Sequence, residues 1–410
     1  MNRAFKTINF VACLALLSAA PVFTQTLSAE AVPEAATTAP VTHVYVQTTD
    51  GVNVFDSTAA GKLTLVKGSP FSTTGQMEGI NGAYLLSVGT DYLHSYKIES
   101  SGALGPQASQ INTQSYGGAQ CGNTAGAGAA LDHTGHYFFV QLYGASYNGG
   151  EDFTCAAWQT YKVETNGEFT FLGDNELGYG FDSSSLDSTM PTISSNDKFT
   201  YGVYYTAFAP VFAPFKLSSN GVLEANSNFT YNNPTPDPSP AGSDNNYFPT
   251  SMAADPAGHV AISMIQSFAT PYPGPAAQLA SFTIGSNGSL TTTNAYADMP
   301  VLWGSVDTTS TFNLRMSPSG KLLAVAGTGL QVFHFNGAAP ITKYSAVLLP
   351  AVQIDQLAWD NNNHLFALSY ETGELYVYTV TPTSISEVSG SPYSVKDAYG
   401  LKGLIVVPTT

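Results

Sequence analysis

The sequence has 410 residues, of which 43% are hydrophobic, 12% aromatic and only 10% charged. A chain of this length and apolar content can bury a large core, which excludes an intrinsically disordered protein. Charged residues make up about a quarter of an average soluble protein, and Ser, Thr, Asn, Tyr and 38 glycines take their place here. The formal net charge is -16, and Arg3 and Arg315 are the only arginines. Because nucleic acids and anionic membranes bind clustered cations, neither is expected as a partner.

The first 31 residues have the layout of a secretory signal peptide. Arg3 and Lys6 precede an apolar run over Phe10–Ala20, and small residues lead to Ala29-Glu30-Ala31. The apolar run is shorter than the roughly 20 residues that span a bilayer, which disfavours a membrane anchor. The sequence therefore predicts export to the periplasm, the cell surface or the medium, with residues 32–41 as a linker and one domain over residues 42–410.

Removal of this segment leaves two cysteines, Cys121 and Cys155. An even number of cysteines in an oxidising compartment predicts a disulfide between them. The alternative is a pair of buried free thiols.

Two turns recur along the chain, out of phase with each other. The first occurs as AAGKL (59–63), SSGAL (100–104), TNGEF (165–169), SNGVL (219–223) and SNGSL (286–290). The second lies within residues 131–140, 194–203, 254–263, 316–325 and 359–368. Each turn stands between short apolar strands, which predicts β-hairpins. A spacing of roughly 40–70 residues is typical of propeller blades with loop insertions.

Each repeat can be divided into four strands, a to d, and the second strand begins near His43, Ala83, His136, Phe199, His259, Lys321 and His364. The first unit lacks strand a. The C-terminal segment LKGLIVV (401–407) follows the last repeat and has the pattern of the missing strand. The sequence thus predicts an all-β, seven-bladed β-propeller whose C-terminal strand completes blade 1 and closes the ring.

The hairpin over Pro318–Val325, the S-N-G-x-L turns and the endings GSPF and GSPY resemble the seven-bladed lactonase-like propellers. That family includes bacterial 6-phosphogluconolactonases and relatives of muconate-lactonising enzymes, and the chain is also similar to surface-layer propellers with Y-V-x-N repeats. The resemblance implies the propeller fold over nearly the whole chain after residue 41. Its motifs build blades and do not specify chemistry.

The resemblance also implies a catalytic pattern, an H-x-H pair before one strand a and an Arg after the next strand b. The corresponding stretches here are Ala125–Asp132 and Val140–Ser146, which contain neither. The catalytic residues of the family are therefore not carried over. A phosphorylated lactone also needs a cationic pocket, whereas residues 42–410 contain one arginine.

The b-to-c and d-to-a connections of all blades should share one face, and the longest connections belong to it. Arg315 and Asn313, in a predicted strand a, should face the axial channel if Leu314 and Met316 face the core. Arg315 could contact an anion or a carbonyl, or could be a structural arginine. Glu78 and Asp307, each just before a strand a, could pair with it or act as a base. The loops of this face carry aromatic residues that could bind a sugar or a protein: Tyr147, Tyr179, Tyr247, Phe248, Tyr272 and Trp303.

No metal site or cofactor is expected. His133 and His136 have metal-like spacing, but their hairpin turn recurs elsewhere without histidine. Phosphate-loop and nucleophile-elbow motifs are absent from the sequence. Two hypotheses follow for this chain, which we expect to be a monomer. The first is a non-catalytic module that binds carbohydrate or an envelope protein, and the alternative is a lactone hydrolase acting on a neutral or weakly charged lactone.

Overall fold

The computed structural model describes residues 39–113, 124–148, 151–179, 189–205, 210–235, 247–266, 277–303, 313–400 and 403–409. The predicted signal peptide and nearly all of the linker lie outside these ranges. The compact unit that contains the sheets spans Thr38–Thr410. No helix in the described ranges is both long and apolar enough to cross a membrane.

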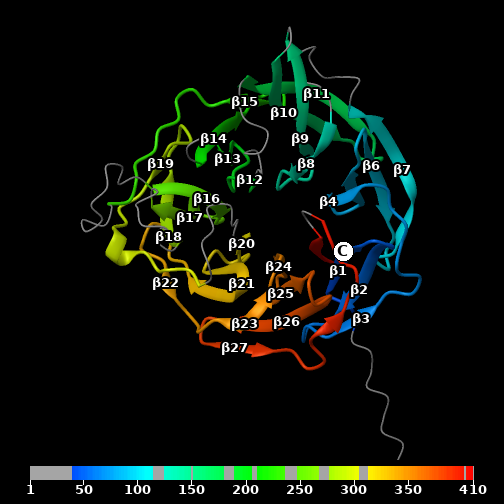
Figure 1. Cartoon of the computed structure of the whole chain (residues 1–410). Coiled ribbons are helices and arrows are strands. Elements are labelled where there is room, and N and C mark those ends of the chain that lie inside the picture. Colours follow the sequence, from blue (N-terminus) through cyan, green and yellow to red (C-terminus); the bar gives the residue numbers. More distant parts are fainter. Residues whose placement is uncertain are drawn as a thin grey trace, which may run out of the picture. The chain divides into compact units, whose positions relative to one another are not determined.

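Seven antiparallel sheets are arranged in a ring (Figure 1). In six of the sheets the main strands follow one another in chain order from the inner to the outer edge, and in the seventh the C-terminal β29 takes the innermost place before β1, β2 and β3, as the sequence predicts. The seven innermost strands contact one another in a closed series, from β29 through β4, β8, β12, β16, β20 and β24 back to β29. The chain is therefore an all-β, seven-bladed β-propeller.

The first four blades have four strands each. Blade 1 contains β29 (Leu404–Pro408), β1 (Thr42–Thr48), β2 (Gly51–Ser57) and β3 (Leu63–Leu65). Blade 2 contains β4 (Gln76–Ile80), β5 (Tyr84–Val88), β6 (Tyr92–Ile98) and β7 (Leu104–Asn112). Blade 3 contains β8 (Thr124–Leu131), β9 (Tyr137–Asn148), β10 (Glu151–Val163) and β11 (Phe169–Tyr179). Blade 4 contains β12 (Thr189–Ile193), β13 (Phe199–Tyr205), β14 (Pro210–Leu217) and β15 (Leu223–Ala225).

The last three blades carry small additions. Blade 5 contains β16 (Tyr247–Ala254), β17 (His259–Gln266), β18 (Gln278–Ile284) and β19 (Leu290–Thr291), followed by the 3-10 turn η3 (Tyr296–Asp298). Blade 6 contains β20 (Asn313–Met316), β21 (Leu322–His334), β22 (Thr342–Lys343) and β23 (Leu348–Gln353). Blade 7 contains β24 (Gln356–Trp359), β25 (His364–Ser369), β26 (Glu374–Thr381), β27 (Ser384–Glu387) and β28 (Tyr393–Ser394).

Strand b of every blade begins within one residue of the predicted position. Blade 6 differs because β21 supplies both strand b and strand c. The backbone N–H of Phe335 donates to the carbonyl of Lys321 (2.9 Å), so the element folds back on itself. The chain reverses at Gly329, which has a φ of 93°. Glycine adopts this backbone conformation without strain, whereas residues with a Cβ do not.

The C-terminal strand closes the ring. β29 pairs antiparallel with β1, from Val46 opposite Leu404 to Thr42 opposite Pro408. The backbone N–H of Thr409 adds a hydrogen bond to the carbonyl of Val41 (3.0 Å). The predicted completion of blade 1 by residues near 401–407 is thus confirmed.

The hydrophobic core is divided among the junctions between blades. Each of seven buried clusters combines residues from two neighbouring sheets, and the cluster between blades 4 and 5 includes Phe199, Tyr201, Ile262 and Phe282. Burial of apolar surface, at about 25 cal/mol per Å², therefore stabilises each blade against the next. A single blade has no core of its own.

A second contact recurs at six of the seven junctions. The glycine of each c-to-d turn lies against the ring at the start of strand b in the preceding blade. The pairs are Gly61 with His364, Gly102 with His43, Gly167 with Tyr84, Gly221 with Tyr137, Gly288 with Phe199 and Gly337 with His259. In two of them a buried tyrosine hydroxyl donates to the glycine carbonyl, Tyr45 to Gly102 (2.9 Å) and Tyr201 to Gly288 (2.8 Å). The recurring turn is thus the docking point between blades.

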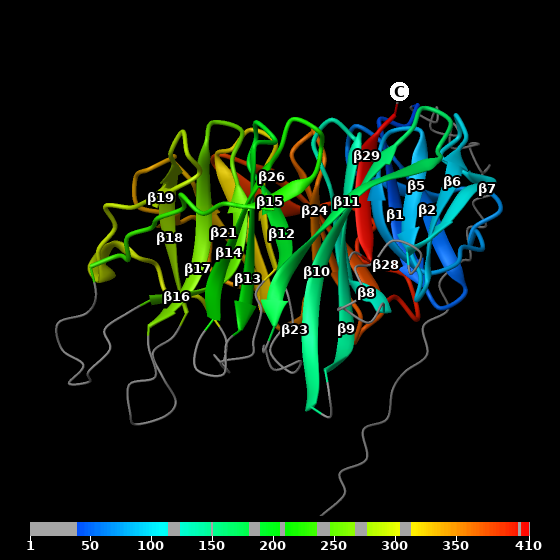
Figure 2. The ribbon, with the colours of Figure 1, turned by 90° about the horizontal axis from the view of Figure 1, so that it is seen from above.

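The a-to-b and c-to-d turns lie on one face, the turn face, and the b-to-c and d-to-a connections lie on the other, the loop face. Figure 2 shows β29 ending on the turn face. It also shows β9 and β10 extending beyond the other strands toward the loop face. Of the predicted disulfide, Cys121 lies outside the described residues, and only the backbone position of Cys155, in β10, is described. The pair stays a prediction.

The glycine contact can be tested in blade 5 by Gly288→Ala, with Gly258→Ala as the matched control. Both glycines have positive φ, 83° and 93°, so both variants carry the same strain of about 1–2 kcal/mol. A Cβ at Gly288 would lie 2.5 Å from Cδ1 of Phe199, whereas a Cβ at Gly258 would meet nothing within 4 Å. We expect Gly288→Ala to lower the free energy of unfolding by about 1–3 kcal/mol more than the control, as overpacking does. Urea denaturation measures both, and equal losses would contradict the docking role.

Candidate functional site

Polar side chains from three blades meet at the inner edge of the ring, toward the loop face. Strand β20 supplies Asn313 and Arg315. Leu314 between them is 1% exposed and packs in the core between blades 5 and 6. Because side chains alternate along a strand, Asn313 and Arg315 lie on the opposite side, toward blade 7. The side chains alternate along β20 as expected. The sequence predicts that Asn313 and Arg315 face the axial channel, whereas Asn313 contacts Asp355 and Gln356 of blade 7.

Asn313 joins blade 6 to blade 7. Its Nδ2 donates to the backbone carbonyl of Asp355 (3.0 Å) and to Oε1 of Gln356 (3.1 Å). Its Oδ1 is buried and has no hydrogen-bond partner among the described residues. A buried acceptor without a partner costs about 1–3 kcal/mol, so Asn313 lowers the stability of the fold where it joins the two blades.

Arg315 is partly buried and has few partners in the described part of the chain. Its Nη1 donates to the carbonyl of Leu314 (3.0 Å), and none of the ion pairs between described residues includes it. Burial lowers the pKa of the guanidinium, and the nearby Tyr370 opposes this shift. The backbone at this position is held by Trp359, whose Nε1 donates to the carbonyl of Arg315 (3.0 Å). Most donors of the guanidinium thus have no acceptor among the described residues.

Asp355 and Tyr370 flank the first two strands of blade 7. Asp355 precedes β24, Tyr370 follows β25, and the backbone N–H of Tyr370 donates to Oδ2 of Asp355 (2.6 Å). Burial raises the pKa of the Asp355 carboxyl, and the charge of Glu371 raises it further. A carboxyl group with a raised pKa is a stronger base than an exposed aspartate once it is ionised.

The same tyrosine connects the cluster to blades 1 and 2. The hydroxyl of Tyr370 donates to the carbonyl of Gly400 (2.5 Å), just before the closing strand. Burial raises the pKa of this hydroxyl, with smaller contributions from Asp355 and Glu78. Glu78, in β4, is 2% exposed and accepts a hydrogen bond at Oε2 from the backbone N–H of Ala129 (3.3 Å). Tyr370 is therefore electrostatically coupled to carboxylates of two blades.

The residues expected from sequence are only partly brought together. Arg315, Asn313 and Glu78 lie on inner strands around this cluster. Tyr247 is 1% exposed and belongs to the core between blades 4 and 5, so it offers no surface for a ligand. Trp303 is 52% exposed, and its backbone N–H donates to Oε1 of Gln331 (3.1 Å), away from the inner edge.

Several of the expected residues cannot be placed. Asp307 and Tyr272 lie outside the described residues, and the side chains of Tyr147 and Tyr179 are not described.

Sequence reasoning missed Asp355, Gln356 and Tyr370. Asp355 precedes a strand a, the position for which Glu78 and Asp307 were chosen in blades 2 and 6. Extending the same comparison to blade 7 would have found it. Nothing in the sequence indicated Tyr370, because its role depends on the approach of the closing segment at Gly400.

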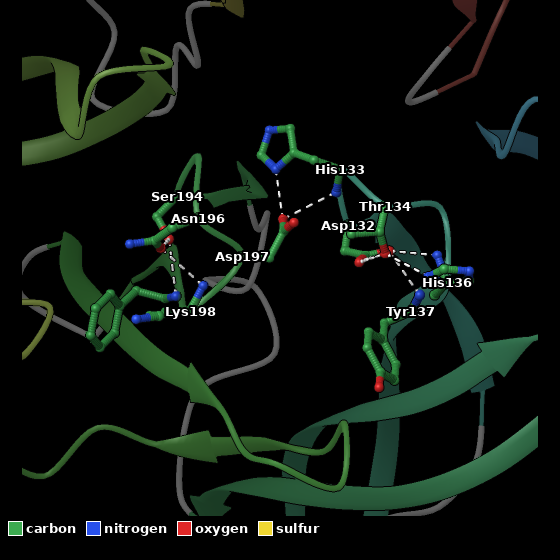
Figure 3. Close-up of polar contacts among 10 residues, drawn as sticks. Asp132, His133, Thr134, His136, Tyr137, Ser194, Asn196, Asp197 and Lys198 are labelled. Carbon is green, nitrogen blue, oxygen red and sulfur yellow. Dashed lines mark hydrogen bonds and ion pairs between the residues drawn. The ribbon is translucent and has the colours of Figure 1, made fainter.

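A second polar cluster lies on the turn face between blades 3 and 4 (Figure 3). Nδ1 of His133 lies 2.6 Å from Oδ1 of Asp197, and Nδ1 of His136 lies 3.0 Å from Oγ1 of Thr134. The two rings thus have separate partners. Within the described ranges, no group of three metal-ligating side chains comes together.

Because the pKa of Asp355 is raised, we expect Asp355→Asn to increase the free energy of unfolding by an amount that depends on pH. The native state holds the Asp355 proton more tightly than the unfolded chain, so this group stabilises below about pH 4, the ordinary range of an aspartate, and loses that contribution as the pH rises. Asparagine imitates the protonated form. Urea denaturation should therefore show Asp355→Asn more stable than the wild type at neutral pH, with the difference vanishing in acid.

The exposed Glu168, which has no side-chain hydrogen bond among the described residues, provides the control variant Glu168→Gln. Its stability should follow the wild type at every pH. If Asp355→Asn increased the free energy of unfolding equally in acid and at neutral pH, the raised pKa of Asp355 would be contradicted.

No protein-family model and no curated protein sequence match this chain. Solved structures do. A putative 6-phosphogluconolactonase from Bacteroides fragilis superposes with a TM-score of 0.60 at 13% identity, covering 91% of this chain and 99% of that one. A periplasmic gluconolactonase from Pseudomonas aeruginosa gives 0.57 at 13% identity, covering 90% and 100%. A putative 6-phosphogluconolactonase from Bacteroides uniformis gives 0.59 at 13% identity, covering 90% and 100%. The chain therefore has the fold of the lactonase-like seven-bladed propellers.

Proposed function

We propose that this chain is a lactone hydrolase whose active site is the inner-edge cluster of Asn313, Arg315, Asp355 and Tyr370. The observation that carries the proposal is the convergence of these polar groups, three of them with shifted pKa values, at the loop face. Convergent polar groups with perturbed pKa values are typical of catalytic sites. A binding module would instead present a broad aromatic or apolar patch.

The groups have the chemistry that ester hydrolysis requires. The ionised Asp355 accepts a proton from water as the water oxygen bonds to the lactone carbonyl carbon. The free donors of Arg315 stabilise the oxyanion of the tetrahedral intermediate. The ring C–O bond then breaks, the ring oxygen takes back the proton that Asp355 accepted from water, and a hydroxy acid is formed. Asn313 positions blade 7 beside the site, since its Nδ2 donates to the carbonyl of Asp355 and to Oε1 of Gln356.

The charges of the cluster favour a neutral or weakly charged lactone. Arg315 is its one arginine, while Glu78, Asp355 and Glu371 supply carboxyl groups. A phosphate group would bring two further negative charges toward these carboxylates, and its recognition calls for clustered cations. Export fits this role, since the N-terminal sequence predicts it and one of the similar structures is of a periplasmic gluconolactonase.

A carbohydrate- or protein-binding module is the second candidate. It is favoured by Trp303, 52% exposed, together with the nearby Val301, 43% exposed. The other large exposed apolar residues in the described part of the chain are spread over different blades: Leu65, Tyr92, Tyr231 and Tyr399. The sequence placed the binding role first, and we place the hydrolase first because the inner-edge cluster supports it.

The test is hydrolysis of a panel of neutral and anionic lactones by the purified protein. We expect turnover of a neutral, hydroxylated lactone, and we expect Arg315→Ala to lower kcat/KM by about 100-fold or more, as loss of an oxyanion donor does. Asn313→Ala, which releases Gln356 and the backbone of Asp355, should lower kcat/KM by a smaller factor. Lys321→Ala, which removes an exposed cation on the turn face, should leave kcat/KM unchanged. Absence of turnover across the panel would overturn the proposal.

A further inference from the structure

Asn-Gly dipeptides stand at six places in the sequence, at Asn81, Asn148, Asn166, Asn220, Asn287 and Asn336. This dipeptide is prone to spontaneous deamidation, because glycine has no side chain to hinder attack by its own amide nitrogen. Gly149 lies outside the described residues, so the geometry can be compared at the other five. We propose that, among these five, Asn336 is the preferred site of deamidation and isoaspartate formation.

The reaction needs two free groups. The backbone nitrogen of the glycine attacks Cγ of the asparagine, an N–Cγ bond forms, and the Cγ–Nδ2 bond breaks. Nδ2 leaves as ammonia, taking the proton of the glycine amide. Water then opens the succinimide, giving aspartate if the new N–Cγ bond breaks and isoaspartate if the original peptide bond breaks. No electrons are transferred, and one water is exchanged for one ammonia.

The side-chain amide is restrained at four of the five positions. The Oδ1 atom accepts a hydrogen bond in each: at Asn81 from the N–H of Ala83 and of Tyr84, at Asn166 from the N–H of Glu168, at Asn220 from the hydroxyl of Ser218, and at Asn287 from the N–H of Ser289. These bonds oppose the rotation of the side-chain amide that the attack requires.

The attacking nitrogen is also engaged at three of these four turns. The N–H of Gly167 donates to the carbonyl of Glu164 (2.9 Å), that of Gly221 to Ser218 (3.0 Å) and that of Gly288 to Gly285 (2.9 Å). Loss of the amide proton, which the attack requires, would break these hydrogen bonds.

Asn336 lacks both restraints. Its side chain is exposed and makes no hydrogen bond with any described residue, and the N–H of Gly337 has no acceptor within the described ranges. The carbonyl of Asn336 accepts a long hydrogen bond from the N–H of Ala339 (3.4 Å). The turn is therefore free to bring Gly337 N and Asn336 Cγ together.

Modification would alter the junction between blades 5 and 6. Gly337 packs on the ring of His259, where a Cβ would lie 3.0 Å from Cε1, and His259 is paired with Asp255 (3.0 Å). Isoaspartate inserts a methylene into the backbone beside this contact. It also adds a carboxylate next to a junction that already contains Asp255. The altered turn should pack less well against blade 5, far from the inner-edge cluster.

The experiment is a time course of the purified full chain in mildly alkaline buffer, followed by proteolysis and mass spectrometry. Deamidation raises the mass of a peptide by about one dalton, and electron-transfer fragmentation distinguishes isoaspartate from aspartate. We expect the Asn336 peptide to convert several-fold faster than the peptides of Asn81, Asn166, Asn220 and Asn287. The same time course in denaturant should bring the five rates close together.

Two variants complete the test. Ser218→Ala removes the side-chain bond to Asn220 and should accelerate deamidation there, without changing the rate at Asn336. Asn336→Gln should abolish the modification and the accompanying fall in melting temperature of aged protein. Conversion at Asn336 no faster than at the other four sites, or an order of rates that persists in denaturant, would overturn the proposal.

Discussion

The pairing of β29 with β1 is the constraint on which the rest of the structure depends. It joins the last strand of the chain to the first and supplies blade 1 with its innermost strand. Because each hydrophobic cluster is shared by two blades, an open ring would expose an apolar surface on blade 1 and another on blade 7. Closure also places Gly400 against Tyr370 and so completes one side of the inner-edge cluster. Stability and the candidate site thus depend on the same few residues at the C-terminus.

The fold could be predicted from the sequence because its signals are local and repeated. A turn such as SNGVL (219–223) needs a residue with positive φ between two apolar strands, and this requirement is visible within five residues. Even the shared endings around Ser69 and Ser391 have the same structure, since each serine Oγ accepts a hydrogen bond from strand c of its own blade. Blade 6 departs from the repeat, because the segment Gly327–Gly329 reverses the chain within the single element β21.

The candidate site could be predicted only in part because its residues are distant along the chain and meet through the closure of the ring. Alternation within β20 was enough to identify Asn313 and Arg315. Glu78 and Tyr370 are separated by most of the sequence, and only the circular arrangement brings their charges within range of each other. Tyr247 was wrongly expected on the ligand-binding face. It lies at the start of a strand a, where a side chain can enter the core as easily as face a ligand.

The docking of a turn glycine on a ring constrains how this protein can diverge. The ring is a histidine in three blades, a tyrosine in two and a phenylalanine in one, whereas the docking residue is glycine in all six. The flat partner can therefore be exchanged for another flat side chain, whereas a methyl group on the glycine would lie 2.4–3.0 Å from an atom of the ring and would force one of them to move. Over long periods, substitutions should accumulate at the ring positions of these six junctions and be selected against at the glycine positions. Blades 1 to 5 could exchange places for the same reason, because each carries a ring for one neighbour and a glycine for the other.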